Sequence, residues 1–151
     1  MSNPTILERV RDNPDELLFR SDTHRVFAAV DAFPRLPYQC VVAPFYGNPG
    51  KPAHFNNLDP QLQMKLFLVA SAIGQKVLRH CTDQQRAVTH IEGFGITDHP
   101  HILVFAAERK QGANLYTGEN LGLVAVQNTI EAIRFLPEEA QELEARLREV
   151  G

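Results

Sequence analysis

The segment from Asp59 to about His80 has the clearest helical pattern in the chain. Asp59 is a natural N-cap residue, and Pro60 suits the first position of a helix. Behind them apolar residues recur at helical spacing, namely Leu62, Leu66, Val69, Ala70, Ile73 and Val77. A helix with such a stripe needs an apolar surface to cover, and the flanking sequence offers short apolar runs. The pattern therefore predicts a long helix packed on a sheet.

Short apolar runs on both sides of this helix are typical of strands. The runs are Leu17–Phe19, Arg25–Asp31, Gln39–Pro44, Ala87–Ile91 and Ile102–Phe105. A tight turn with two prolines, Pro34–Pro37, joins the second run to the third and indicates an antiparallel hairpin. We therefore expect an α+β fold with an antiparallel sheet of about five strands and the long helix on one face.

The remaining segments are less uniform. Pro4–Arg11 fits a short helix, and residues 45–57 and 109–120 read as loops. Leu121–Phe135 is ambiguous between strand and helix. Pro137 begins a C-terminal helix with one apolar stripe, formed by Ala140, Leu143, Leu147 and Val150. We expect this helix to be an addition to the sheet or a dimer element; packing of the stripe onto its own domain is the alternative.

Size and charge limit the class of protein. The 151 residues suit a single domain, 1–151, and 44% hydrophobic with 22% charged residues is typical of a globular chain. The net charge of -3 argues against a duplex nucleic-acid binder but leaves room for a nucleotide site. Cys40 and Cys81 match no metal or redox spacing. The longest apolar run, Leu66–Ile73, is too short for a membrane span, so we expect a cytoplasmic protein without membrane contact.

Two histidines stand two residues apart in the segment His99-Pro100-His101. On a strand, His99, His101 and Leu103 share one face. Such a pair has three interpretations: structural chance, half of a metal site, or a nucleophile with its orienting partner. The metal interpretation lacks support nearby, because Asp98 faces the other way and no Cys-x-x-Cys or Glu-x-x-His element accompanies the pair. We therefore expect no metal and no cofactor.

The wider context of this segment resembles the histidine-triad (HIT) superfamily of nucleotidyl hydrolases and transferases. The motif of that superfamily, His-x-His-x-His followed by apolar residues, is similar to His99–Phe105. Phe19–Pro44 is similar to the family's first hairpin, and the Asn57-Leu58-Asp59 opening of the long helix also fits. The resemblance covers about residues 17–107, and residues 108–151 form a C-terminal extension outside it.

The resemblance implies a mechanism and a set of site residues. His101 matches the nucleophile that attacks the α-phosphorus of a nucleotide, with formation of a covalent nucleotidyl-histidine, and His99 supports its orientation. Asp31 matches the acidic residue that binds the ribose hydroxyls. Backbone amides around Gly95 and Thr97 would hold the phosphate. The base pocket would be lined by Phe19, Phe27 and Ala29. The implied partner is a purine nucleotide or a nucleotide conjugate.

Each of these residues also has a purely structural interpretation. Asp31 before a turn can be an Asx-turn residue, Phe27 can belong to the core alone, and Gly93–Gly95 can be a permissive turn. The four other histidines read as solvated or packed bystanders, namely His24, His54, His80 and His90.

Two positions depart from the family pattern. The third histidine is Leu103, which cannot donate a hydrogen bond at the phosphate or leaving group, and a site that is often histidine in the second strand of the hairpin is Gln39. His-Pro-His is similar to the branch containing galactose-1-phosphate uridylyltransferase, where the third position is Gln. The leading hypothesis is a nucleotidyl hydrolase or transferase. The alternatives are a nucleotide-binding or regulatory module without turnover, and a structural dimer or partner-binding domain with no ligand. We also expect a homodimer, since members of the family commonly join sheets edge to edge.

Overall fold

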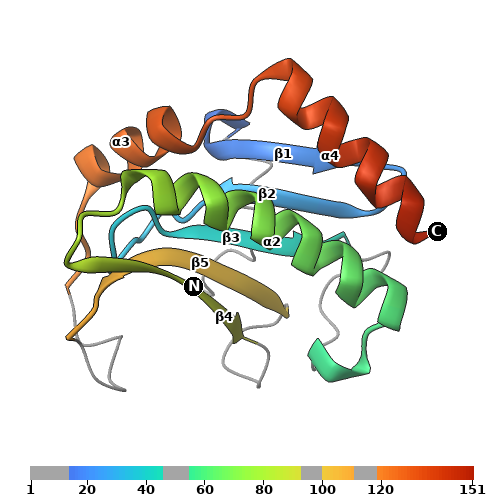
Figure 1. The fold of residues 1–151 in the computed structure, drawn as a ribbon, viewed down its shortest axis with the longest axis horizontal. Coiled ribbons are helices and arrows are strands. Elements are labelled where there is room, and N and C mark those ends of the chain that lie inside the picture. Colours follow the sequence, from blue (N-terminus) through green and yellow to red (C-terminus); the bar gives the residue numbers. More distant parts are fainter. Residues whose placement is uncertain (1–13, 46–54, 93–99, 111–118) are drawn as a thin grey trace, which may run out of the picture.

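The computed structural model describes residues 14–45, 55–92, 100–110 and 119–151. In this part of the chain five strands form one antiparallel sheet in the order β1-β2-β3-β5-β4 (Figure 1). The strands are β1 (Leu17–Ser21), β2 (Val26–Val30), β3 (Cys40–Pro44), β4 (Gln85–Glu92) and β5 (His101–Glu108). The helices are α2 (Pro60–His80), α3 (Leu123–Ile133) and α4 (Pro137–Val150), with 3-10 turns at Pro14–Glu16 and Phe55–Asn57. The predicted α+β architecture is confirmed; the helix expected at 4–11 lies outside the described residues.

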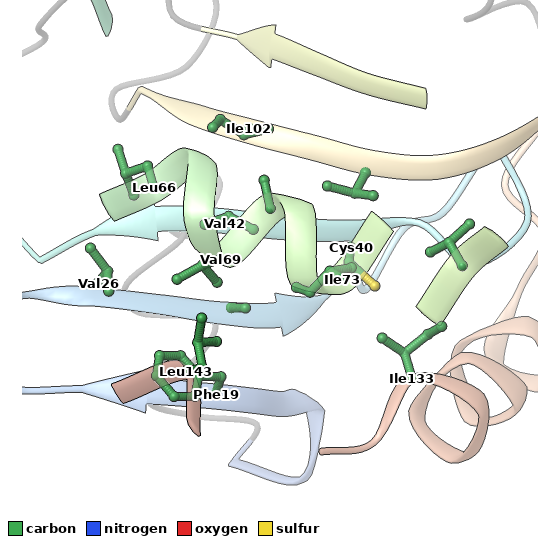
Figure 2. Packing of buried hydrophobic residues seen from close by; sticks show 14 of the residues in the cluster. Phe19, Val26, Cys40, Val42, Leu66, Val69, Ile73, Ile102, Ile133 and Leu143 are labelled. Atoms are coloured by element: carbon green, nitrogen blue, oxygen red, sulfur yellow. The ribbon is translucent and has the colours of Figure 1, made fainter. Parts of the chain in front are cut away.

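The three helices lie on the same face of the sheet (Figure 1). Helix α2 begins as its sequence predicts, because the Asp59 side chain accepts a hydrogen bond from the Gln61 amide at 3.2 Å. Its buried stripe meets the sheet residues that point to this side, as Figure 2 shows for Leu66, Val69 and Ile73 around Val42. The burial of this stripe is the main force that holds the helix on the sheet.

The ambiguous segment 121–135 forms helix α3. Its buried residues are Val126, Thr129 and Ile133, a spacing that puts one helical stripe against the core. Gly122 precedes the helix with φ 86°, a conformation that side chains other than glycine rarely adopt. The helical interpretation is therefore the correct one.

The C-terminal helix α4 packs onto its own domain. Leu143 and Leu147 are buried in the same core as α2, and Figure 2 shows Leu143 beside Phe19 of β1. Polar bonds hold both sides of the helix, since Ser21 Oγ donates to Glu144 at 2.9 Å and Lys76 Nζ donates to Glu139 at 2.7 Å. The apolar stripe of α4 therefore packs onto its own domain, which is the alternative that the sequence had left open.

The opposite face of the sheet carries a second apolar cluster, which we call the open-face cluster because α2, α3 and α4 lie on the other side of the sheet; the residues of the cluster are themselves buried. It consists of Phe27, Ala29, Leu36, Val41, Ala43, Leu103, Phe105 and Ala107. Strands β2 and β3 are buried along their whole length, and β5 is buried up to Ala107. These strands therefore read as continuous apolar runs rather than as alternating ones.

None of the helices in the described segments combines the length and the apolar character that crossing a bilayer requires.

Candidate functional site

One row of cross-strand neighbours runs across the whole open face. Strand pairing places Leu17 opposite Ala29, Ala29 opposite Val41, Val41 opposite Leu103, and Leu103 opposite His90. Directly opposed residues of antiparallel strands point to the same side, with Cβ atoms about 4.5–5.5 Å apart. This row, from Leu17 to His90, is the central row of the candidate site.

His101 is the first residue of β5 and lies two residues before Leu103, so both side chains share the open face. The His101 residue is only 5% exposed. Its pairing partner on β4 is Glu92, and on the other side Ile102, one residue further, pairs with Val42 of β3. The imidazole is therefore held at one end of the open face, next to the row of Phe27 and Ala43.

Asp31 lies at the other end of the same face, directly after β2. Its amide donates to the Gln39 carbonyl at 3.0 Å, and its carboxylate accepts from the Phe33 amide at 2.9 Å and from Gln39 Nε2 at 2.8 Å. The bond to Phe33 is that of an Asx turn, so Asp31 has the structural role that its place before a turn predicts. A carboxylate oxygen can accept more than one hydrogen bond, so a role in the turn and a contact to a ligand do not exclude each other.

Gln39 fixes both this carboxylate and the preceding turn. Its side chain is buried, and Oε1 accepts from the amides of Arg35 and Leu36, each at 3.2 Å, while Nε2 donates to Asp31. The amide group of a glutamine has an acceptor oxygen and an NH2 donor, whereas a histidine has only two ring nitrogens. Gln39 can therefore bind the two turn amides and the Asp31 carboxylate at the same time. In the sequence, Gln39 stands out only as a departure from the family pattern; the available signal for its contact with Asp31 was its place on the other side of the Pro34–Pro37 turn.

Phe19 does not share the open face. The pairing of β1 with β2 shifts between Leu17, opposite Ala29, and Phe19, opposite Ala28. This bulge sends Leu17 to the open face and Phe19 to the helix side, where its ring lies 5.9 Å from that of Phe135. The expectation that Phe19 lines one pocket with Phe27 and Ala29 is therefore corrected; only the latter two lie together.

Three expected site residues, His99, Gly95 and Thr97, lie outside the described residues, as does Gly93. His90, expected to be a bystander, is brought beside Leu103. Its signal in the sequence was its position on a strand, but the register that aligns it with Leu103 depends on the pairing of β4 with β5. No local pattern encodes that register.

Cys40 is a free cysteine that is buried in the structure. Burial, with the Asp31 charge as a smaller cause, raises the pKa of the Cys40 thiol far above its usual range, and Cys40 faces the helices. The thiolate is the reactive form, so this thiol is inert near neutral pH. Within the described segments, no group of three or more His, Cys, Asp and Glu side chains is arranged to hold a metal ion.

Comparison with known proteins gives no match to a family model or to a curated protein. The fold, however, matches solved structures at low identity. A HIT-like protein involved in cell-cycle regulation from Bartonella henselae, with an unknown ligand, is 15% identical with a TM-score of 0.64, covering 88% of this chain and 96% of its own.

Two further structures agree. A zinc-bound histidine triad family protein from Mycobacterium smegmatis is 12% identical with a TM-score of 0.58, covering 86% of each chain. A hypothetical histidine triad nucleotide-binding protein from Sulfolobus tokodaii is 14% identical with a TM-score of 0.57, covering 89% of this chain and 91% of its own. Sheet order, helix placement and these matches lead to one conclusion: the chain has the histidine-triad (HIT) fold.

Proposed function

We propose that this protein binds a purine nucleotide or nucleotide conjugate on the open face of its sheet and acts there as a nucleotidyl hydrolase or transferase. The observation that carries the proposal is the buried His101 on the same face as Asp31 and an apolar floor that includes Phe27 and Ala29. The fold supports it, since one protein with this fold is described as a nucleotide-binding protein.

The spacing of the two polar groups fits an extended ligand. Asp31 lies across from Gln39, and His101 lies one residue beyond Ile102, the partner of Val42. From Gln39 to the level of His101 the sheet extends four residues, or about 13 Å along the strands, and β2 and β5 are two strand spacings apart, or about 9–10 Å, so the two backbone positions are about 16 Å apart diagonally. Side chains from both ends shorten this gap, which leaves a span suited to a nucleoside with its phosphate rather than to a single ion.

The proposed chemistry is nucleophilic. A ring nitrogen of His101 attacks the α-phosphorus, the bond to the leaving group breaks, and a nucleotidyl-histidine forms. Water or another acceptor then discharges this intermediate. His99 would orient the nucleophile, amides around Gly95 and Thr97 would hold the phosphate, and Asp31 would bind the ribose hydroxyls.

The second candidate is a nucleotide-binding module without turnover. Leu103 favours it, because the side chain in the middle of the face is apolar and offers no hydrogen-bond donor. Loss of one preorganised donor typically costs about 10²–10³ in rate. Binding alone would require only Asp31, the apolar floor and the backbone amides.

An adduct-trapping experiment separates the two candidates. Adenine and guanine nucleotides labelled at the α-phosphate are incubated with wild type and with His101→Asn, and the protein is quenched in alkali and counted. We expect an acid-labile label on wild type only. The nucleotide affinity of His101→Asn should stay within a few-fold of wild type, because the nucleophile stabilises the transition state rather than the bound ground state. His80→Asn is the matched control, since His80 contacts the Ala132 carbonyl at 3.1 Å away from this face.

Two outcomes would contradict parts of the proposal. Equal trace hydrolysis in wild type and His101→Asn, with no label on either, eliminates the enzyme and leaves the binding module. Asp31→Ala should weaken the binding of ribonucleotides more than that of deoxyribonucleotides; an equal effect on both would contradict the ribose-binding role of Asp31. Thermal melts of each variant show whether the fold is intact.

A further inference from the structure

His90 of β4 lies on the open face beside the position where the third histidine is missing. The pairing of β4 with β5 puts His90 directly opposite Leu103 and Val88 directly opposite Phe105. Val88 packs against the open-face cluster, which contains both Leu103 and Phe105. Because side chains alternate along a strand, His90 points to the same side as Val88.

His90 and His101 are diagonal neighbours on this face. His101 lies two residues before Leu103, the cross-strand partner of His90. Diagonal neighbours in an antiparallel pair are about 7–8 Å apart, with their Cβ atoms somewhat closer. Two imidazole rings at that separation can both reach a phosphoryl group placed between them.

The other residues of the central row cannot transfer a proton. Leu17, Ala29, Val41 and Leu103 all have hydrocarbon side chains, so within this row the imidazole of His90 is the group with a titratable proton. An imidazole can donate a proton in one step and accept a proton in the next.

Building on the proposed function, we propose that His90 is the second imidazole of the site and the general acid and base at the leaving group. In the first step the His101 nitrogen bonds to phosphorus, the phosphorus–oxygen bond to the leaving group breaks, and protonated His90 gives its proton to the departing oxygen. In the second step neutral His90 takes a proton from the attacking water as the phosphorus–nitrogen bond breaks. The imidazole missing at Leu103 is thus supplied from the neighbouring strand.

A pair of substrates that differ only in leaving group tests this role. The probes are the p-nitrophenyl ester and an alkyl ester of adenosine 5′-monophosphate, of which only the alkoxide needs a proton to depart. We expect His90→Gln to lower the rate of adduct formation from the alkyl ester by about 100-fold or more and from the p-nitrophenyl ester by only a few-fold. Thr89→Ala is the control, since Thr89 is exposed and opposite Val104 on the other face of β5, and should leave both rates unchanged.

A transfer of the imidazole across the row gives a second test. In the double variant with His90→Gln and Leu103→His, the imidazole moves to the directly opposed position on β5. We expect this variant to recover at least about 10-fold of the loss with the alkyl ester, since opposed Cβ atoms are only about 4.5–5.5 Å apart.

The outcomes also separate this inference from the proposal on which it rests. The role of His90 is overturned if wild type forms an adduct and His90→Gln slows adduct formation equally with both esters or not at all. That result would leave His101 as the nucleophile. Wild type that forms no adduct with either ester overturns both. Melting curves that match wild type exclude a folding defect as the source of a selective loss.

Discussion

Gln39 allows a prediction whose size follows from its hydrogen bonds. Its side chain makes three, from the amides of Arg35 and Leu36 to Oε1 and from Nε2 to the Asp31 carboxylate. Gln39→Leu keeps the apolar contacts of the buried position but removes all three bonds. The Leu36 amide and the Asp31 carboxylate each lose their hydrogen bond to Gln39.

The expected loss of stability can be worked from these bonds. Two neutral bonds contribute about 1 kcal/mol each, and the bond to the charged carboxylate contributes about 1.5–3 kcal/mol. Water can reach half-buried Asp31 and offset part of the last term, so we expect a net loss of about 3 kcal/mol. For a chain of this size that corresponds to a fall in Tm of roughly 6–12 °C.

Gln39→Glu turns the attraction to Asp31 into a repulsion and keeps the hydrogen bonds from the Arg35 and Leu36 amides. The carboxylate still accepts from the Arg35 and Leu36 amides, but it faces Asp31 where Nε2 lay 2.8 Å away. Two carboxylates at that distance cannot both be charged, so they share a proton and their folded-state pKa rises above the unfolded values of about 3.9 and 4.3. The folded state then binds more protons than the unfolded state, so the variant gains stability as the pH falls.

Urea denaturation of wild type and both variants between pH 4.5 and 7.5 measures these effects. Gln39→Leu should be less stable than wild type at every pH, whereas the deficit of Gln39→Glu should be about 2–4 kcal/mol at pH 7.5 and shrink towards pH 4.5. A Gln39→Leu variant as stable as wild type, or a Gln39→Glu deficit that does not depend on pH, would refute the hydrogen-bond argument.

Three further predictions concern packing and assembly. The Lys76 ammonium, and secondly the Leu136 amide, hold the pKa of the Glu139 carboxyl below its ordinary value, so the pair stabilises the fold above about pH 4.3 and less as the pH falls through the lowered pKa. Lys76→Met should therefore cost about 1 kcal/mol in urea at pH 7 and less at pH 3.5. Leu147→Ala should cost about 2–5 kcal/mol in the same assay, and the exposed Leu78→Ala under about 0.5 kcal/mol; similar losses would mean that α4 is not part of the core. We expect a homodimer through an outer strand, β1 or β4, and a sedimentation mass that stays at 17.0 kDa at all concentrations would contradict it.

The architecture was predictable because its signals are local. Asp59 and Pro60 fix the start of α2 through capping and a preset φ, and the helical spacing behind them does not depend on tertiary contacts. Segment 121–135 could not be assigned from the sequence, because its run of apolar residues fits the period of a helix as well as that of a strand. Packing decided it, since only a helix brings Val126, Thr129 and Ile133 to one side.

The site was harder to predict because it depends on register. Asp31, Phe27 and Ala29 follow strand alternation, and their common face could be read from the sequence. Phe19 was misplaced because a bulge in β1 reverses its direction, and no residue type in the strand announces that bulge. The placement of His90 beside Leu103 was not predicted for a related reason, because cross-strand partners are set by the pairing of two strands that are separated in sequence.

Burial of β5 on both faces divides its residues into two interleaved sets. Ile102, Val104 and Ala106 pack under the helices, whereas His101, Leu103 and Phe105 line the other side. The first set carries the cohesion of the two layers, and the second contributes less to that layer contact. A substitution at one position of β5 therefore disturbs the packing of one face at a time: changes at Leu103 or Phe105 leave the residues that contact the helices in place, although each still costs the burial of a core side chain.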